Sequence, residues 1–556
     1  MKKLIILSIF IFLLCFIRID NKSYLKQIDL FEANEFLNKK QNNYPKPVTN
    51  FDLSKQNNNY QEADFLKYDN NYIYFLNNNV LNIFDMNNNY LIKSLSFNDF
   101  YCYQLLINDN DIILMGSKTQ KYNIIPGRQI YYEEEDFTLY FINKINFNIS
   151  RTIIFYQSIF LESVIVNNKL YLILTNNNIF DEDNKSFKYP KYYDSFSQEE
   201  QLNENNLYLN ETGDNIYSLL LIACIDNSIN VTGYLGMSSF IRIIDNKLFV
   251  SNSLYLDQNK TTIHVFSLNN FSYINQITLD GYLVNKYCLY CYDNYLRIIL
   301  SNYQGSNYIY NISLIDYKIK DYKSIAPNEN IMAIYFENNY CFLTSYLYID
   351  PLFIVDFSNP YSINIKEKYL PYIGNNIFDF DDKIILLSSN EDNNKIIISL
   401  IKKNNLEIEK ELTFTGTNIF FEATYNKNDL VILDNELFTF SSEENNNIFY
   451  KIDLNNLSIK EKINFNNEYI LRCIITKNAY IITNENIYIY SLKDFTLIKK
   501  ALKKSRFYAG LEEIYYSIAM YFFSSLVAST SFLTVKDKTP SWSLALTSSS
   551  LTPSPT

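Results

Sequence analysis

The sequence predicts an all-β fold, a β-propeller of about eight four-stranded blades. Three observations support it: a strand-rich unit recurs roughly every 40–50 residues, short apolar runs fit buried strands, and Asn-rich turns separate the runs. The unit is clearest when VLNIFDMNNNYLIKSLSF, ending at Phe97, is compared with FYKIDLNNLSIKEKINF, ending at Phe465. Each unit has a strand, a short Asn/Asp turn and a second strand.

Radial closure would hide the strand edges of such a chain and bury the faces of each sheet against its neighbours. Closure predicts that the unit at Ala63–Phe97 lies beside the unit at Tyr469–Leu502, with almost no helix between Ala63 and Lys500. An open solenoid or a parallel α/β sheet would contradict this prediction.

The composition suits pleated, half-buried surfaces. The chain has 556 residues, of which 47% are hydrophobic, with 50 Tyr and 41 Phe, and this content excludes a disordered body. Only 10 Gly are present. Asn tolerates the left-handed conformation better than other non-Gly residues, so runs such as Asn77–Asn79 and Asn87–Asn89 are predicted to be turns.

The charge balance argues against a nucleic-acid partner. The net charge is −11, from 49 basic and 60 acidic residues, whereas nucleic-acid binding needs a basic footprint. The excess of acidic residues is interpreted as a solubility feature.

Residues 1–19 are predicted to be a signal peptide or an anchor helix. Lys2 and Lys3 precede an uncharged run that Arg18 ends, as in a secretory signal. The run is short for a spanning helix, but no small-residue cleavage motif follows it, so an uncleaved anchor and a buried helix or strand stay open as alternatives. Cys15 lacks the small preceding residue that lipidation would need.

Residues 20–62 are polar and irregular and are interpreted as a lead-in segment, and residues 63–502 as the propeller. Two insertions interrupt the repeat, at Tyr122–Glu135 and at Asn176–Tyr217. Blade counts above eight are rare, so one of the nine apparent units is expected to be incomplete or fused to a neighbour. The units begin near Ala63, Tyr101, Leu161, Phe240, Tyr287, Ile331, Asn375, Asn418 and Tyr469.

Residues 503–556 form a tail of different composition. The last Asn of this Asn-rich chain is Asn486, and the only Trp, Trp542, lies in the tail. The uncharged segment 514–535 is long enough to span a bilayer. The basic residues before it would place the propeller in the cytoplasm, which conflicts with export. A transmembrane helix, a packed or interfacial helix, and a frameshifted or misjoined sequence are the three interpretations.

Four stretches carry a resemblance to a known family: Thr261–Leu268, Gly281–Ile298, Ile325–Ser345 and, most specifically, IDPLFIVDFSNP at Ile349–Pro360. They resemble the secreted β-propeller family that is distantly related to WD40 repeats. FFEATY at Phe420–Tyr425 is similar to that family's SEALYDHKAF stretch but lacks its His. The resemblance implies an exported propeller, and it implies no activity and no site residues.

No residue set predicts catalysis or a cofactor. The single His, His264, lies in the apolar strand TTIHVFSL, where a structural role is expected, and a site with several His ligands is excluded. Cys288 and Cys291 form a CxxC, but positions i and i+3 of a strand point to opposite faces, so both are expected in the core. The motifs of sialidase, quinone-dependent, WD and kelch propellers are missing.

The identity of any metal site stays unknown from the sequence. Asp181, Asp183 and Asn184 could supply oxygen ligands to a hard cation, but they are interpreted as a solvated acidic loop, like Glu133–Asp136. Asp350 and Asp356 bracket the PLFIV strand and are expected at a blade turn.

The preferred interpretation is an exported, non-catalytic interaction module, secreted or membrane-anchored, whose ligand is a protein or a glycan. The two insertions are its expected contact surfaces, because binding residues concentrate on loops. A terminal helix could add membrane association. The alternative is a carboxylate-based extracytoplasmic hydrolase acting on glycans or peptides. It predicts three or more carboxylates and an Arg at one mouth of the central channel.

Overall fold

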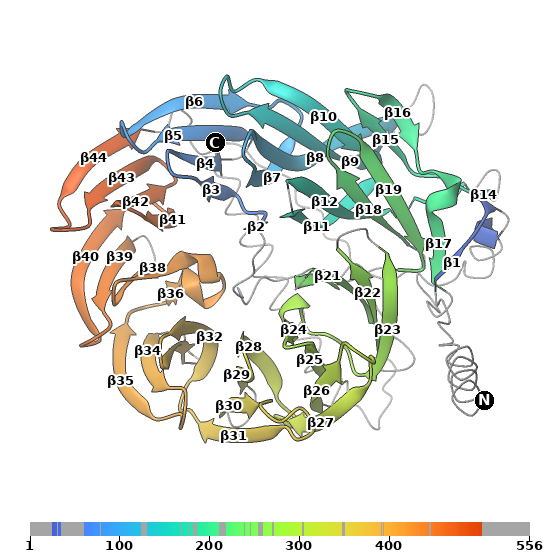
Figure 1. Ribbon diagram of the computed structural model, residues 1–556. Coiled ribbons are helices and arrows are strands. Elements are labelled where there is room, and N and C mark those ends of the chain that lie inside the picture. Colours follow the sequence, from blue (N-terminus) through green and yellow to red (C-terminus); the bar gives the residue numbers. More distant parts are fainter. Residues whose placement is uncertain are drawn as a thin grey trace, which may run out of the picture. The chain divides into compact units, whose positions relative to one another are not determined.

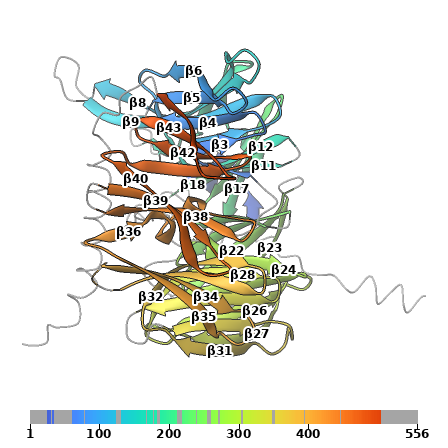
Figure 2. The same ribbon diagram turned by 90° about the vertical axis from the view of Figure 1, so that its left-hand side faces the viewer.

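Nine largely antiparallel sheets follow one another around a central axis and close into a β-propeller (Figure 1). In a plain four-stranded blade the first strand lies nearest the axis and the fourth lies at the rim. The orthogonal view agrees in placing the blades that end in β6 and in β31 at opposite ends of the ring (Figure 2). The prediction of about eight blades is corrected to nine, because the unit near Leu161 is a complete blade whose second and third strands are separated by the long insertion.

The computed structural model describes residues 25–30, 32–34 and 61–502, with gaps at 78, 124–130, 167, 177, 182–185, 211–217, 238–239, 245, 254–259, 269–271, 303–304, 347–350, 391, 393 and 444–445. The predicted signal or anchor (1–19) and the tail (503–556), with its segment 514–535, lie outside the described residues. Within the described part, no helix has the length and apolar character needed to cross a membrane.

Six blades are plain four-stranded sheets. Blade 1 holds β3 (Leu66–Tyr68), β4 (Tyr72–Asn77), β5 (Val80–Asp85) and β6 (Tyr90–Ser96). Blade 4 holds β20 (Phe240–Ile244), β21 (Lys247–Ser253), β22 (Lys260–Ser267) and β23 (Tyr273–Asp280). Blade 5 holds β24 (Leu289–Tyr292), β25 (Tyr295–Ser301), β26 (Asn307–Ser313) and β27 (Ile319–Ile325), after the short 3-10 helix η2 (Lys286–Cys288). Blade 6 holds β28 (Asn330–Glu337), β29 (Tyr340–Tyr346), β30 (Pro351–Asp356) and β31 (Asn364–Tyr369). Blade 7 holds β32 (Ile373–Phe380), β33 (Lys383–Ser389), β34 (Lys395–Lys402) and β35 (Ile408–Thr415), and blade 9 holds β41 (Ile470–Ile475), β42 (Asn478–Thr483), β43 (Asn486–Ser491) and β44 (Leu497–Leu502).

Three blades carry additions. Blade 2 holds β7 (Tyr101–Ile107), β8 (Asp111–Asn123), β9 (Tyr131–Asn143) and β10 (Ile149–Phe155), extended by β15 (Lys191–Asp194) and β16 (Gln198–Gln201). Blade 3 holds β11 (Ser158–Val166), β12 (Lys169–Asn176), β18 (Leu219–Ile225) and β19 (Ile229–Leu235), extended by β17 (Leu207–Asn210), β1 (Leu25–Gln27) and β2 (Gln61–Glu62). Blade 8 holds β38 (Glu436–Glu443), β39 (Asn446–Asp453) and β40 (Ser458–Asn466), and its first strand is split into β36 (Ile419–Phe421) and β37 (Leu430–Leu433).

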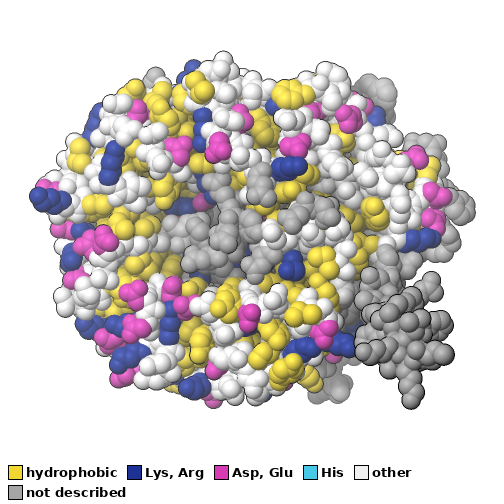
Figure 3. All heavy atoms as spheres, in the orientation of Figure 1, with side chains coloured by type: hydrophobic (Ala, Val, Ile, Leu, Met, Phe, Trp, Pro, Cys, Tyr) yellow, Lys and Arg dark blue, Asp and Glu magenta, His cyan; other side chains and the backbone are white. Residues whose placement is uncertain are grey.

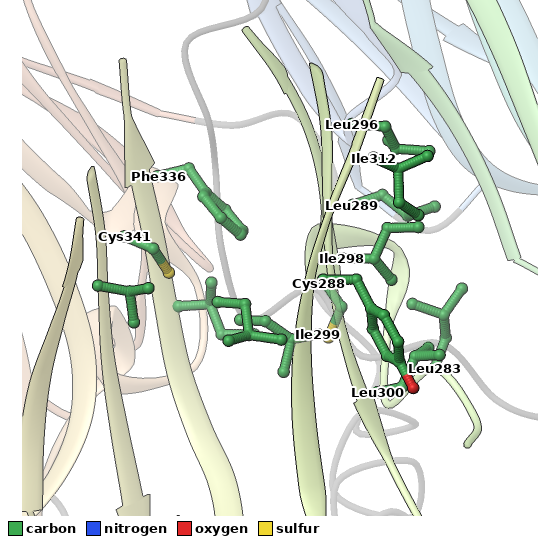
Figure 4. Close-up of a cluster of buried hydrophobic side chains, with 14 of the residues drawn as sticks. Leu283, Cys288, Leu289, Leu296, Ile298, Ile299, Leu300, Ile312, Phe336 and Cys341 are labelled. Carbon is green, nitrogen blue, oxygen red and sulfur yellow. The ribbon is translucent and has the colours of Figure 1, made fainter. Parts of the chain in front are cut away.

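Apolar side chains fill the seams between neighbouring blades. Figure 4 shows one such cluster, in which Cys288 and Ile299 of blade 5 lie close to Phe336 and Cys341 of blade 6. Burying each such aliphatic or aromatic side chain contributes about 1.5–3 kcal/mol. Because seams replace a single central core, every blade needs its neighbours.

This packing explains the sequence pattern. Inner strands are covered on both faces by adjacent blades, so β34 has six buried residues in succession, five of them apolar. The rim strand β35 is covered on one face only, and its exposed and partly buried residues alternate. The short apolar runs of the sequence are therefore inner strands, and the alternating ones lie at the rim.

The turn between the third and fourth strands recurs with one unusual residue, and we call it the rim turn. In five blades a bulky residue takes a left-handed conformation there, with φ between 49° and 59°. Such a conformation costs roughly 1–3 kcal/mol. The cost is offset because the side chain packs into an apolar cluster at a seam between blades. The five residues are Phe147, Tyr317, Leu406, Leu457 and Phe495.

The ring closes through side chains and not through a shared strand. Blade 1 and blade 9 each take all four strands from one continuous segment. Their seam holds a buried apolar cluster, the Tyr480 hydroxyl donates to the Met86 carbonyl at 3.2 Å, and Lys477 Nζ donates to Asn87 Oδ1 at 2.9 Å. The predicted adjacency of the first and last units is confirmed. Almost no helix was predicted between Ala63 and Lys500. Among the described residues of that range, the helices are three-residue 3-10 turns.

The two insertions leave the ring from the same kind of connection, the one between the second and third strands, in the adjacent blades 2 and 3. Because successive strands alternate in direction, all such connections emerge on one face, which we call the insertion face. In blade 2 the strands β8 and β9 each reach 13 residues and form a long hairpin.

The blade 3 insertion contains several short strands and is not the loop that the sequence predicted. It forms the hairpin of β13 (Phe180–Asp181) and β14 (Ser186–Phe187), then β15 and β16, the 3-10 helix η1 (Glu204–Asn206) and β17. The segment interpreted as an irregular lead-in also supplies strands, since β1 pairs with β17 and β2 pairs with β11. Blade 3 is thereby extended at both its rim and its axial edge.

Candidate functional site

The residues that the sequence singled out lie mostly in the core. His264 on β22 is fully buried, its Nε2 lies 3.3 Å from Asn210 Nδ2, and burial lowers its pKa to about 3. An imidazole with so low a pKa and no exposed surface is a poor general base for a catalytic triad. Cys288 and Cys291 are both buried in the same apolar cluster, although Cys288 lies in η2 and not on a strand. Burial raises the pKa of Cys288 to about 11, which leaves an unreactive thiol.

The acidic residues that were predicted to lie in loops and turns are found in different parts of the fold. Glu133–Asp136, predicted as a solvated loop, belongs to β9, and Asp136 is buried with Oδ1 accepting the Gln157 N–H at 2.9 Å. That prediction is wrong for Asp136, because the blade 2 hairpin is longer than expected. Asp356 Oδ1 accepts the Ser358 N–H at 2.8 Å, as expected of a turn residue. Asp183, Asn184 and Asp350 lie outside the described residues, and Asp181 is placed on β13 by its backbone alone.

The four arginines of the described propeller were not predicted to share a role, yet each is buried and joins its blade to the next. Arg151 of blade 2 donates to the Asp226 carbonyl of blade 3, and it pairs with Asp194 at 2.7 Å. Arg242 of blade 4 lies 4.5 Å from the ring centre of Tyr287, next to blade 5. Arg297 of blade 5 donates to Asn339 Oδ1 of blade 6 at 2.5 Å. The fourth is Arg472 of blade 9.

Arg472 is the centre of a polar group that we call the closure cluster: Asp64, Glu422, Asn428, Asp429 and Arg472. Arg472 lies on β41, next to the axis, and its side chain is 5% exposed. Its Nη1 lies 3.0 Å from Asp64 Oδ2, immediately before blade 1, and its Nε lies 2.9 Å from Asp429 Oδ1 of blade 8. Asn428 Nδ2 also donates to Asp64 Oδ2, at 3.2 Å. The cluster therefore ties three blades together across the point of closure.

The first strand of blade 8 places the other members. Between β36 and β37 the chain leaves the sheet in two 3-10 turns, η3 (Glu422–Thr424) and η4 (Lys427–Asp429). In η4, Asn426 caps the turn by accepting the Asn428 N–H at 3.0 Å, and this fixes Asn428 and Asp429. The stretch FFEATY, noted for its resemblance, enters this bulge. Figure 1 shows the bulge projecting from β36 toward the axis.

Burial dominates the electrostatics of the cluster. Burial and the nearby Asp429 charge raise the pKa of Glu422 to about 8, against the opposing effect of Arg472. Burial raises the pKa of Asp429 to about 7, although Arg472 opposes the shift. For Arg472, burial disfavours the charge, but Asp429 and Asp64 outweigh it, and the pKa of the guanidinium is raised.

The cluster has the composition that the hydrolase alternative predicted, three carboxylates and an Arg near the axis. The ion pairs and hydrogen bonds of these carboxylates differ from those expected of the two catalytic acids of a hydrolase. Asp64 and Asp429 share one guanidinium, and Asp64 Oδ1 also accepts the Phe65 N–H at 2.8 Å. Glu422 and Asp429 both have a raised pKa, but Asp429 is paired with Arg472, and no second carboxylate is left unengaged as base or nucleophile. Among the described residues, no group of acidic, His or Cys side chains has the arrangement of a metal site.

A second feature is a cavity of about 220 Å³ on blades 2 and 3, which we call the insertion pocket. Its wall is formed by the connection from β10 to β11 and by the blade 3 insertion. It is lined by residues 156–157, Asn176, Asn178, residues 188–191 and Glu199.

On the face shown in Figure 3, basic and acidic side chains are interspersed and no basic stripe appears.

Comparisons with known proteins agree with the fold. A family model described as a beta propeller domain matches residues 53–369. An uncharacterized protein of Methanocaldococcus jannaschii is 21% identical over 255 residues, which are 43% of this chain and 40% of that protein. An uncharacterized protein of Archaeoglobus fulgidus is 26% identical over 196 residues, 34% of this chain and 31% of that protein. The chain therefore matches less than half the length of these curated relatives.

Solved structures show only a distant likeness. Dihydro-heme d1 dehydrogenase NirN in complex with DHE is 10% identical with a TM-score of 0.38, covering 82% of this chain and 75% of that one. BamB from Moraxella catarrhalis is 8% identical with a TM-score of 0.34, covering 51% of this chain and 83% of that one. Neither likeness is strong enough to inform function. The family model, in contrast, matches more than half of the chain, so the protein belongs to the beta propeller domain family.

Proposed function

We propose that the chain is an exported, non-catalytic interaction module, which binds a protein or glycan partner through the insertion face of blades 2 and 3. The observation that carries the proposal is the gathering of both large insertions on one face of two adjacent blades. Elsewhere in the described ring the blades keep to four strands, apart from the split first strand of blade 8. Binding residues are disproportionately found on such additions to a rigid scaffold.

The closure cluster favours this proposal over the hydrolase alternative. Two of its three carboxylates, those of Asp64 and Asp429, are paired with Arg472, so the cluster is better suited to holding blades together than to proton transfer. Export enters the proposal from the sequence of residues 1–19, whose basic start and apolar run fit a secretory signal.

The test uses the register of the long hairpin. Lys118 and Asp136 are direct cross-strand partners, so residues 119–135 can be replaced by a two-residue Asn-Gly turn without changing the pairing below it. The trimmed protein should fold and lose its partner in cross-linking captures from the extracytoplasmic fraction. The matched control shortens the equivalent connection of blade 7, residues 390–394, and should keep the partner. Capture of the same partner by the trimmed protein would contradict the proposal.

Export is tested separately. Residues 1–62 fused to a reporter that is active only outside the cytoplasm should give activity, and replacing Lys2 and Lys3 by Glu should reduce it. An inactive fusion that is stably expressed would contradict export and leave the binding surface untouched.

A further inference from the structure

We infer that the insertion pocket binds one acidic sugar unit of a glycan. The inference rests on the proposed function, because it names the ligand of the same face. At about 220 Å³ the cavity lies below the 300–1,000 Å³ of pockets for drug-sized ligands, so it suits a single ring or a chain end.

The chemistry of the wall fits a sugar ring. Its apolar surface comes from the side chains of Tyr156, Tyr189 and Pro190, and the lining includes no aliphatic Leu, Ile or Val. Polar side chains, among them those of Asn176 and Asn178, form the rest of the lining. A pyranose has the same two characters, an apolar C–H face and a rim of hydroxyls.

The charged side chains of the pocket wall favour a ligand that carries an acidic group. Lys191 is paired with Glu199 at 2.8 Å, so these two charges compensate each other. Lys188 Nζ instead donates to a neutral acceptor, Gln157 Oε1, at 3.0 Å. The lining therefore carries one net positive charge, and a carboxylate on the ligand would convert the Lys188 contact into a charge-assisted one.

The wall is pre-organised. Gln157 has a left-handed backbone, with φ of 54°, and its Oε1 also accepts from Asn178 Nδ2 at 2.8 Å. Asn176 Nδ2 donates to the Tyr156 carbonyl at 3.2 Å, which links the insertion to the connection between blades 2 and 3. The Tyr189 hydroxyl is buried and makes no hydrogen bond to any described residue. Groups fixed in this way lose little freedom on binding.

The experiment is ligand-observed NMR and calorimetry on the full chain with three probes: methyl β-glucuronide, methyl β-glucoside and acetate. The glucuronide should bind saturably and more tightly than either other probe. Lys188→Gln should weaken glucuronide binding roughly 10-fold or more, the effect of losing a charge-assisted hydrogen bond. The control Lys366→Gln, at an exposed lysine of blade 6, should leave binding unchanged.

Equal binding of glucuronide and glucoside, or unchanged binding in Lys188→Gln, would overturn the inference. If no probe binds while the trimmed hairpin still loses its partner, the acidic-sugar inference fails and the proposed function stands. If the sugar binds and the trimmed hairpin keeps its partner, the proposed contact through the hairpin fails instead.

Discussion

At the residue scale, the Arg472 guanidinium lies between the carboxylates of Asp64 and Asp429, which belong to different blades. Removing one partner of a buried ion pair leaves a buried charge uncompensated and costs about 3–5 kcal/mol. Arg472→Met should therefore lower the free energy of unfolding by that amount, measured by urea denaturation.

The matched control is Lys460→Met. Lys460 pairs with Glu436, but its side chain is 43% exposed, and such pairs contribute about 0–1 kcal/mol. Adding Asp429→Asn to Arg472→Met should cost less than the sum of the single changes, because the two residues share one interaction. Strict additivity would show that the ion pair does not stabilise closure.

Glu422 gives a prediction for pH. Its pKa is raised from 4.5 to about 8 in the folded protein, so between these values the folded chain binds more protons than the unfolded chain. The free energy of unfolding contributed by this group is full below about pH 4.5 and falls as the pH rises through about 8. Melting temperatures measured across that range should fall less steeply for Glu422→Gln than for the wild type. Parallel pH profiles would show that Glu422 ionises normally in the fold.

At the element scale, the rim turns should stabilise the seams. Phe495 is buried and its ring stacks on Phe449 at 5.8 Å and on Tyr490 at 5.4 Å. Phe495→Ala keeps the left-handed strain and removes the packing, so it should cost about 3–5 kcal/mol in chemical denaturation. Tyr361→Ala, in the corresponding turn of blade 6 but 69% exposed, should change stability by less than about 0.5 kcal/mol.

The blade 3 insertion is expected to be essential for folding. Deleting residues 184–210 would remove β15, β16 and β17 together with the buried Leu202 and Leu207. It would also leave Arg151 without Asp194, its buried partner. The deleted protein should lack a cooperative unfolding transition in circular dichroism. A deletion protein that melts cooperatively near the wild-type temperature would show that these strands are dispensable.

At the scale of the whole molecule, the repeat period was sufficient to predict the architecture, because each blade reuses one strand order and inner strands leave the same apolar signature. The predicted start of the first unit at Ala63 and of the last at Tyr469 both lie within a few residues of β3 and β41. The blade count was harder, since one connection carries the long insertion that itself forms strands.

The closure cluster could not be predicted in the same way. Asp64 and Arg472 are 408 residues apart, and no local spacing marks the pair in a chain with 60 acidic residues. The one usable signal was FFEATY, which leads into the bulge that holds Glu422 and Asp429. The insertion pocket could not be predicted from the sequence either, because its wall combines the connection between two blades with an insertion that was expected to be a loop.

The seam between blades 9 and 1 is the junction at which the ring can open without breaking a chain connection between blades. Every other junction is bridged by the continuous chain, whereas here only side chains hold two intact sheets together. Once this seam opens, the propeller becomes a row of blades with two free ends, and the blades at the ends of such a row unfold first. In native-state hydrogen exchange the amides of blades 1 and 9 should therefore open together, at lower free energy than those of blade 5. A covalent cross-link across this one seam would be expected to slow unfolding more than the same link at any other.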